Sequence, residues 1–291
     1  MFSKNTPTFC ALFNQNPNQT TVMKVNKVLS TLAVCAFTAL SFTSCSKKEN
    51  VQAPDAVSED VLTQIKALGF TSTGAKKVDN GYLVEGDIFL TDADLKSAPQ
   101  NEFLRVGDEE QYRTNNLVSV GTSQRTITIA VSSTLPSAYV TATDELIRRY
   151  NALNLRIRFS RVTSGANITL TKAPSGAGYL ASAGFPSGGN PYSQVLVNSN
   201  SIGTSYATTY IATILAHEVG HCIGFRHTDY MGRQYSCGGS AVNEGASTVG
   251  AVHIPGTPTG VDPNSWMLAC IGYGGNRPFN SNDQVALNYI Y

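Results

Sequence analysis

Three of the four histidines in this 291-residue chain lie in one short run, residues 217–227, which reads HEVGHCIGFRH. On a helix, residues four apart lie on one face, so His217 and His221 can present ring nitrogens to the same ion. Zinc binds such nitrogens and, in catalytic sites, keeps a fourth position for water. Glu218, the neighbour of His217, is placed to take a proton from that water. The run therefore predicts a site for one catalytic Zn²⁺.

Gly224 and His227 complete the pattern. Glycine often ends a helix because it tolerates a positive φ, so the chain can turn at Gly224 and bring His227 back as the third ligand. A solvated helix face could carry two histidines and a glutamate by chance, but the extended pattern favours a metal site. We predict His217, His221 and His227 as ligands and Glu218 as the general base.

The N-terminal part has the features of an exported protein. Residues 24–27 contain two lysines, and residues 28–42 form an apolar stretch that is too short to span a membrane. Small residues precede Cys45 and a polar segment follows it, which resembles the lipobox of bacterial lipoproteins. We predict a signal peptide over residues 1–44, with Met23 as an alternative start. A lipid on Cys45 would then attach the protein to the outer membrane or cell surface, and an ordinary signal peptide with extracellular release is the alternative.

Composition and cysteine positions agree with this location. Charged residues make up 14% of the chain and the net charge is +1, so we expect no basic face and no nucleic-acid partner. Three cysteines follow the leader, and a disulfide between them is permitted outside the cytoplasm. Spacing does not fix the pairing, but Cys237 and Cys270 both lie in the loop-rich C-terminal part and are the preferred pair. Cys222 would remain a buried thiol. We expect a monomer.

Composition shifts divide the rest of the chain. Residues 45–58 form a tether, and residues 59–110 form a pro-segment-like region with an Asn-Gly hairpin turn at residues 80–81. A polar linker over residues 111–125 contains Arg113 and Arg125 as candidate processing points. The catalytic domain, residues 126–291, is long enough to fold as one compact unit.

Apolar periodicity within that domain predicts the elements that position the histidines. The fold class is α+β: a twisted mixed sheet packs on the zinc-binding helix, and a loop-rich C-terminal subdomain with a terminal helix follows. Ser281 and Gln284 are predicted to form the capping box of that last helix. The expected strands cover residues 127–131, 155–159, 168–170 and 194–197, and the expected helices cover residues 137–152, 206–224 and 281–291.

These features together resemble the metzincin zinc endopeptidases. Ser265-Trp266-Met267 looks like the methionine turn that lies beneath the zinc ligands in that clan, which implies that Met267 supports the ligands. Residues 180–186 are similar to the matrixin stretch that leads from the edge strand. The resemblance implies a metzincin-like catalytic domain and a protein or peptide substrate extended along the edge strand near residues 179–184. We expect the wall of the specificity pocket in residues 252–263.

The resemblance is most specific to the bacterial dual-action HEIGH metallopeptidase family, and it runs from Val84 to the C-terminus. Val219 stands where that family's eponymous string has Ile. Astacins are less similar, because Thr228 and Ala269 stand where astacins carry Glu and Tyr. The astacin-type tyrosine that assists the transition state therefore has no direct counterpart, and the nearby Tyr273 is the candidate for this role.

Residues 84–88, Val-Glu-Gly-Asp-Ile, look like the astacin propeptide segment whose aspartate occupies the water position of the zinc. The resemblance implies that Asp87 is a zymogen switch that keeps the precursor inactive. A carboxylate oxygen is a suitable zinc ligand. A surface turn after a strand is the alternative, since Gly-Asp is common there.

These inferences predict an exported zinc-dependent endopeptidase that hydrolyses peptide bonds through a zinc-bound water activated by Glu218. A catalytically silent surface-binding lipoprotein with a retained zinc site is the alternative from a different class. Glu218 argues against it, because a structural zinc has no use for a general base. A zinc amidase acting on cell-wall or other non-protein amides is a third reading, which the substrate would decide.

Overall fold

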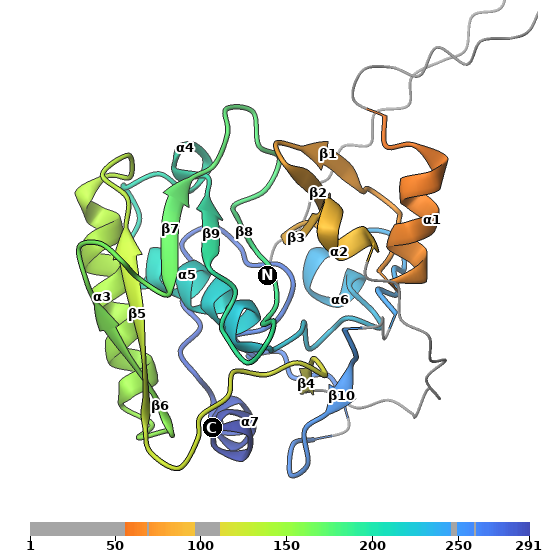
Figure 1. Ribbon diagram of the computed structural model, residues 1–291. Helices are drawn as coiled ribbons and strands as arrows, with labels where there is room; N and C mark the ends of the chain where they lie inside the picture. The colour runs from red at the N-terminus through yellow and green to blue at the C-terminus, as the bar shows by residue number, and fades with distance from the viewer. Residues whose placement is uncertain (1–55, 69, 97–110, 246–248, 259) are drawn as a thin grey trace, which may run out of the picture. The chain divides into compact units, whose positions relative to one another are not determined.

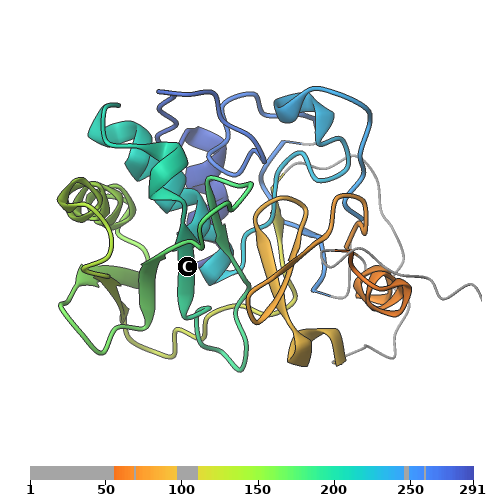
Figure 2. The same cartoon turned by 90° about the horizontal axis from the view of Figure 1, so that it is seen from above.

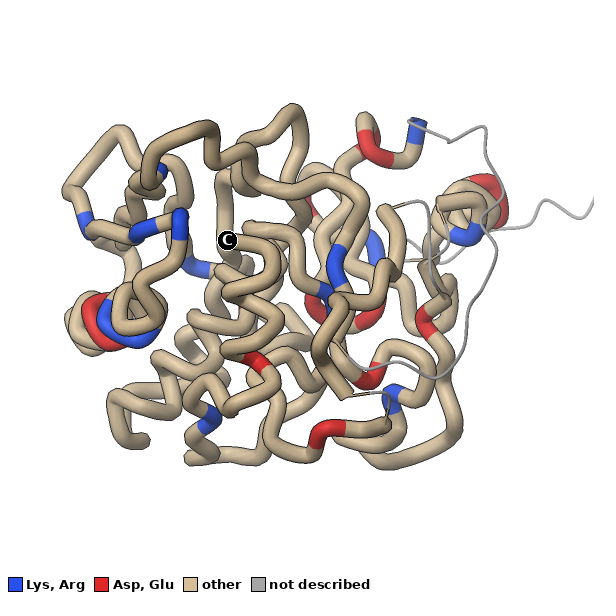
Figure 3. The backbone as a smooth tube through the Cα atoms, turned by 90° about the horizontal axis from the view of Figure 1, so that it is seen from below, with Lys and Arg blue, Asp and Glu red and all other residues tan. Residues whose placement is uncertain are grey.

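The computed structural model describes residues 56–291 except 69, 97–110, 246–248 and 259. The predicted signal peptide and Cys45 lie outside the described residues. Among the helices described, none has the length and apolar character needed to cross a membrane. Charged positions are sparse along the described chain, and acidic positions are interspersed with basic ones (Figure 3).

An eight-stranded mixed sheet is the framework of the described part (Figure 1). The strands of the large sheet, in spatial order, are β1 (Lys76–Val78), β2 (Gly81–Val84), β3 (Ile88–Thr91), β8 (Ala181–Ala183), β9 (Gln194–Val197), β7 (Ile168–Lys172), β5 (Arg125–Val131) and β6 (Ile157–Arg161). Strands β6, β5, β7 and β9 run parallel to one another, and β8 runs antiparallel to β9. A separate two-stranded sheet pairs β4 (Tyr112–Arg113) with β10 (Val252–His253).

Two long helices, α3 (Ser137–Asn151) and α5 (Thr208–Ile223), lie on the same side of this sheet (Figure 2). Both contribute to one large apolar core that also includes the inward side chains of the strands. This arrangement confirms the predicted α+β class with a mixed sheet packed on the helix of the histidine run. The remaining helices are α1 (Glu59–Ala67), α2 (Asp92–Lys96), α4 (Ser199–Ile202), α6 (Gln234–Cys237) and α7 (Ser281–Ile290).

The start of α7 differs by one residue from the expected capping box of Ser281 and Gln284. Asn280 is the N-cap: its side chain accepts the backbone N–H of Asp283 at 2.9 Å, and Asp283 accepts the N–H of Asn280 at 3.0 Å. Asp283 also accepts a hydrogen bond from the Ser265 hydroxyl at 2.9 Å. The carboxylate of Asp283 therefore both caps α7 and connects α7 to the predicted methionine turn.

Residues 111–125, expected to be a linker, instead pack against the catalytic part. The buried Gln111 donates to Asp283 Oδ1 at 2.9 Å, and the next two residues form β4. Arg113 and Arg125, the candidate processing points, lie in β4 and β5. The polar composition misled the prediction because these polar groups form hydrogen bonds within the folded protein.

The strand expected at the sheet edge is covered. Strand β8 pairs with β9 on one side and with β3 on the other, where Ile88 lies parallel to Ala183. Strands β1, β2 and β3, together called the N-terminal hairpin here, thus extend the sheet beyond β8 (Figure 1). This region has its own apolar cluster, which includes Ile65, Phe70 and Val84. The hairpin occupies the edge at which the resemblance places the substrate.

Candidate metal centre

Helix α5 positions the first two histidines of the run. Its residues from Tyr210 to Ile223 are all buried. Gly224 caps its C-terminus with φ 110°, a left-handed conformation that favours glycine, and its N–H bonds back to the carbonyl of His221. The chain then turns, as predicted, and brings His227 to the same point as His217 and His221.

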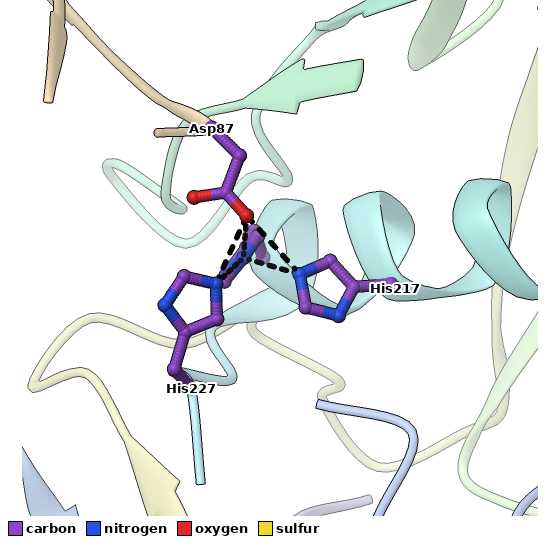
Figure 4. Close-up of side chains that lie close together, drawn as sticks. Asp87, His217 and His227 are labelled. Atoms are coloured by element: carbon purple, nitrogen blue, oxygen red, sulfur yellow. Dashed lines mark hydrogen bonds and ion pairs between the residues drawn. The ribbon is translucent and has the colours of Figure 1, made fainter. Parts of the chain in front are cut away.

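The ring nitrogens of the three histidines converge with a carboxylate oxygen from the N-terminal hairpin (Figure 4). His221 Nε2 lies 3.1 Å from His217 Nε2 and 3.2 Å from His227 Nε2. Asp87 Oδ2 lies 3.0 Å from His227 Nε2 and 3.4 Å from His217 Nε2. Ligand atoms 2.0–2.1 Å from a tetrahedral ion are about 3.3–3.4 Å apart, so the spacing and the donor types fit zinc.

The hydrogen bonds of the second ring nitrogen, Nδ1, explain why a cation fits between the three Nε2 atoms. The Nδ1 atoms lie 3.0 Å from the carbonyl oxygen of Trp266, 2.9 Å from that of Phe225, and 3.0 Å from the Glu244 carboxylate, in the order His217, His221, His227. Each partner is an acceptor, so each Nδ1 carries the proton and each Nε2 presents a lone pair. Three lone pairs that face one point repel one another unless an ion lies there.

Glu244 contacts one of the three histidines, and sequence reasoning missed it. It is 1% exposed, and both of its carboxylate oxygens lie within 3.1 Å of His227 Nδ1. The segment between His227 and Glu244 contains the short helix α6 and has no periodic pattern, so spacing gave no signal. A glutamate between residues 229 and 251 of the loop, where acidic residues are rare, was the available clue.

Replacing Glu244 with Gln is expected to weaken zinc binding about tenfold, because a neutral amide orients His227 less firmly and lowers its basicity as a ligand. Competition for zinc with a chelating dye measures the affinity. Glu59→Gln, at the exposed start of α1, makes the same chemical change away from the histidines and serves as control. Equal affinity in the two variants would contradict the role given to Glu244.

The predicted methionine turn lies directly beneath α5. A Cβ atom added to Gly220 would lie 2.4 Å from Trp266 Cη2 and 2.7 Å from Met267 Sδ. The buried Met267 also accepts the N–H of Thr228 through its carbonyl oxygen at 3.0 Å. Met267 and Trp266 therefore form the floor on which the helix and the third histidine rest, and glycine at position 220 permits this close approach.

A disulfide joins Cys237, at the end of α6, to Cys270, just after the turn. It is the pair preferred from the sequence. Asp229 reinforces this connection, because it accepts the Ala269 N–H at 2.9 Å. Cys222 is a buried free thiol, as expected. The disulfide and the Asp229 hydrogen bond thus connect the segment after His227 to the segment after the methionine turn.

A cavity of about 260 Å³ adjoins His217 and Glu218. Its walls come from the start of β8, from α5 and from the segment 268–271 after the methionine turn. Residues 252–263 were expected to form the wall, but none of the described residues of that stretch lines this cavity, and Val252 and His253 pair with β4. The stretch after the turn approaches the cavity because the disulfide at Cys270 holds it there.

Glu218 lies between the cavity and the histidines. It is 3% exposed, and among the described residues its Oε2 has no hydrogen-bond partner. Burial, together with the neighbouring Asp87 carboxylate, raises the pKa of Glu218 above its usual range. A buried carboxyl that faces a cavity without a partner is placed to exchange a proton with a bound molecule.

Two tyrosines differ in their position relative to the cavity. Tyr273 is 70% exposed and stacks on Tyr206, and it does not line the cavity. Tyr179, the first residue of the stretch expected to contact substrate, does line the cavity. Burial raises the pKa of Tyr179, and the nearby Glu218 carboxylate adds to this effect. The position of Tyr179 depends on how the loop before β8 folds over α5, which spacing along the chain does not reveal.

Asp87 is buried rather than exposed in a surface turn. The two preceding residues have left-handed φ values, 54° at Glu85 and 92° at Gly86, which direct Asp87 toward the histidines. Glu85 lies 3.2 Å from the buried Arg226 Nη2.

A comparison with protein families agrees with this site. The sequence model of the family described as dual-action HEIGH metallo-peptidase matches residues 82–291. Two solved structures of myroilysin are similar at 14% identity. One has a TM-score of 0.33 and covers 58% of this chain and 90% of its own, and the other has a TM-score of 0.35 and covers 56% and 77%. No curated protein matches.

Proposed function

This chain belongs to the dual-action HEIGH metallopeptidase family, and on that premise we propose that it is an exported zinc endopeptidase made as an inactive lipoprotein precursor. The family makes it a metallopeptidase, a hydrolase of peptide bonds whose metal is typically zinc. The observation that carries the proposal is the convergence of three histidine Nε2 atoms beside Glu218, at the mouth of a cavity.

Zinc held by His217, His221 and His227 would lower the pKa of water toward about 7 and polarise the scissile carbonyl. Glu218 takes the proton of the attacking water and delivers it to the leaving amine. The acceptors at the three Nδ1 atoms hold the rings in one orientation, so little reorganisation accompanies the reaction. The backbone of β8 offers hydrogen bonds to an extended peptide once β3 is gone.

Removal of the metal is expected to abolish cleavage of casein and of quenched fluorescent peptides, and added zinc is expected to restore it, because zinc is the group proposed to polarise the carbonyl. The chain from Gln111 onward, which begins at a buried residue that is hydrogen-bonded to Asp283, is the form to assay. A folded, zinc-loaded protein that cleaves no peptide would favour the surface-binding alternative, and cleavage of cell-wall amides alone would favour an amidase.

Three features support an inactive precursor. Asp87 Oδ2 takes the fourth position beside the three Nε2 atoms, where water would bind. Strand β3 occupies the side of β8 that a substrate would use. The buried ion pair between Glu85 and Arg226 holds the turn in place from the other side. The N-terminal region thus combines a ligand for the metal with a strand in the substrate's place.

Export and lipid attachment rest on the leader sequence. The polar segment after Cys45 and the disulfide between Cys237 and Cys270 both suit a protein that works outside the cytoplasm. The mass of the mature N-terminus checks the proposal: a diacylglyceryl group on Cys45 supports surface attachment, and an unmodified N-terminus elsewhere refutes it.

A further inference from the structure

Two arginines line the cavity that adjoins the zinc-site residues, Arg233 and Arg277. The carboxylates in its lining are Asp87 and Glu218, which already belong to the metal centre. Apolar side chains such as that of Leu268 supply much of the remaining wall. The positive charges in this cavity therefore need an explanation of their own.

Arg233 is engaged with the precursor's own groups. Its Nη1 donates a hydrogen bond to the carbonyl oxygen of Glu85 and lies 3.6 Å from Glu244 Oε1. A Cβ atom on Gly86 would lie 2.5 Å from Arg233 Nη2, so the guanidinium packs directly on the N-terminal turn. Its charge is balanced while the N-terminal region is in place.

Arg277 differs because its charge has no such balance. Its Nη1 donates to the carbonyl oxygen of Cys270 at 2.8 Å, and its backbone N–H donates to Thr213 Oγ1 at 3.1 Å. Within the part of the chain that the structure describes, no carboxylate forms an ion pair with it. Burial lowers the pKa of Arg277, with Asp229 and Asp283 acting in the opposite direction from a distance.

A half-buried guanidinium with unused N–H donors is costly to desolvate and favours a planar anion that can accept two hydrogen bonds. The cavity volume of about 260 Å³ admits a side chain of the size of glutamate. The apolar wall would contact the methylene groups of such a side chain, and the carboxylate would meet the guanidinium.

We propose that Arg277 makes this cavity selective for an acidic side chain, so that the enzyme cleaves peptide bonds adjoining Asp or Glu. The proposal rests on the peptidase function proposed above and assigns its substrate class. Because the cavity touches His217 and Glu218, the selected side chain belongs to a residue next to the scissile bond.

Peptide pairs that differ only by Glu or Gln next to the scissile bond test the charge at constant shape. The full chain carrying Asp87→Ala, loaded with zinc, is expected to show a kcat/KM ratio of Glu over Gln peptide of about ten or more, as for a charge-assisted hydrogen bond. Arg277→Gln is expected to bring that ratio close to one, and Arg277→Lys to keep part of it. Arg161→Gln, on the surface strand β6, should leave the ratio unchanged.

A kcat/KM ratio of Glu over Gln peptide near one in the full Asp87→Ala chain, or a ratio that Arg277→Gln leaves intact, would overturn the proposal. If neither this chain nor the chain from Gln111 onward, which lacks β3, cleaves any of the peptides, the peptidase function fails, and binding then decides the cavity separately. Fluorescence anisotropy with the zinc-loaded Asp87→Ala, Glu218→Ala chain must show tighter binding of the Glu peptide, lost in Arg277→Gln. Equal binding of the two peptides would overturn the acidic selectivity.

Discussion

Glu218→Ala is expected to lower kcat for peptide cleavage by about 10²–10⁴-fold while the zinc content stays equal to that of the parent. The alanine cannot accept the proton of the attacking water or return it to the leaving amine. The zinc ligands are unaffected, because the carboxylate of Glu218 is not one of the four converging groups. The loss should therefore appear in kcat, with little change in KM.

The measurement is the hydrolysis of a quenched peptide by the chain from Gln111 onward, with zinc determined in the same samples. Asp144→Ala removes an exposed carboxylate that pairs with Arg161, and it serves as the matched control. Glu218→Gln keeps the shape of the side chain and should be as inactive as the alanine variant. Parent-like activity in either Glu218 variant would contradict its role as the base.

The three histidines could be placed from the sequence because their geometry is local. Helical spacing puts His217 and His221 on one face of α5. Gly224, which ends the helix, lets the chain turn so that His227 lies beside them. No long-range contact is needed to bring their nitrogens together. The fold class followed for a similar reason, since strands and helices with clear periodicity dominate the catalytic part.

Residues that act through tertiary packing could not be found in this way. Glu244 reaches His227 from an aperiodic loop, and the cavity wall depends on the segment that the disulfide at Cys270 holds in place. The pairing of β3 with β8 joins strands that lie far apart along the chain, so the strand expected at the edge became internal. Local patterns carry no information on such pairings, which depend on the assembled core.

Asp87→Ala is expected to raise the peptidase activity of the full, unprocessed chain by about 10- to 100-fold, as expected for the loss of one charge-assisted contact. In the precursor the Asp87 carboxylate lies where water must bind, with its Oδ2 3.0 Å from His227 Nε2. The alanine frees that position and also removes the attraction between the carboxylate and the site. Strand β3 then remains as the only part of the N-terminal hairpin that obstructs β8.

Activity is compared between three proteins: the full chain, the full chain carrying Asp87→Ala, and the chain from Gln111 onward, which lacks residue 87. Asp79→Ala, in the exposed hairpin turn, controls for changes in the stability of the N-terminal region. A second readout is independent of activity: the full Asp87→Ala chain should bind zinc more weakly than the parent, because it has lost one of four protein ligands. If the activity ratio between precursor and truncated enzyme stays unchanged and zinc affinity does not fall, Asp87 is not the switch. If affinity falls and the chain stays silent, Asp87 is a ligand and the obstruction by β3 is sufficient to keep the precursor inactive.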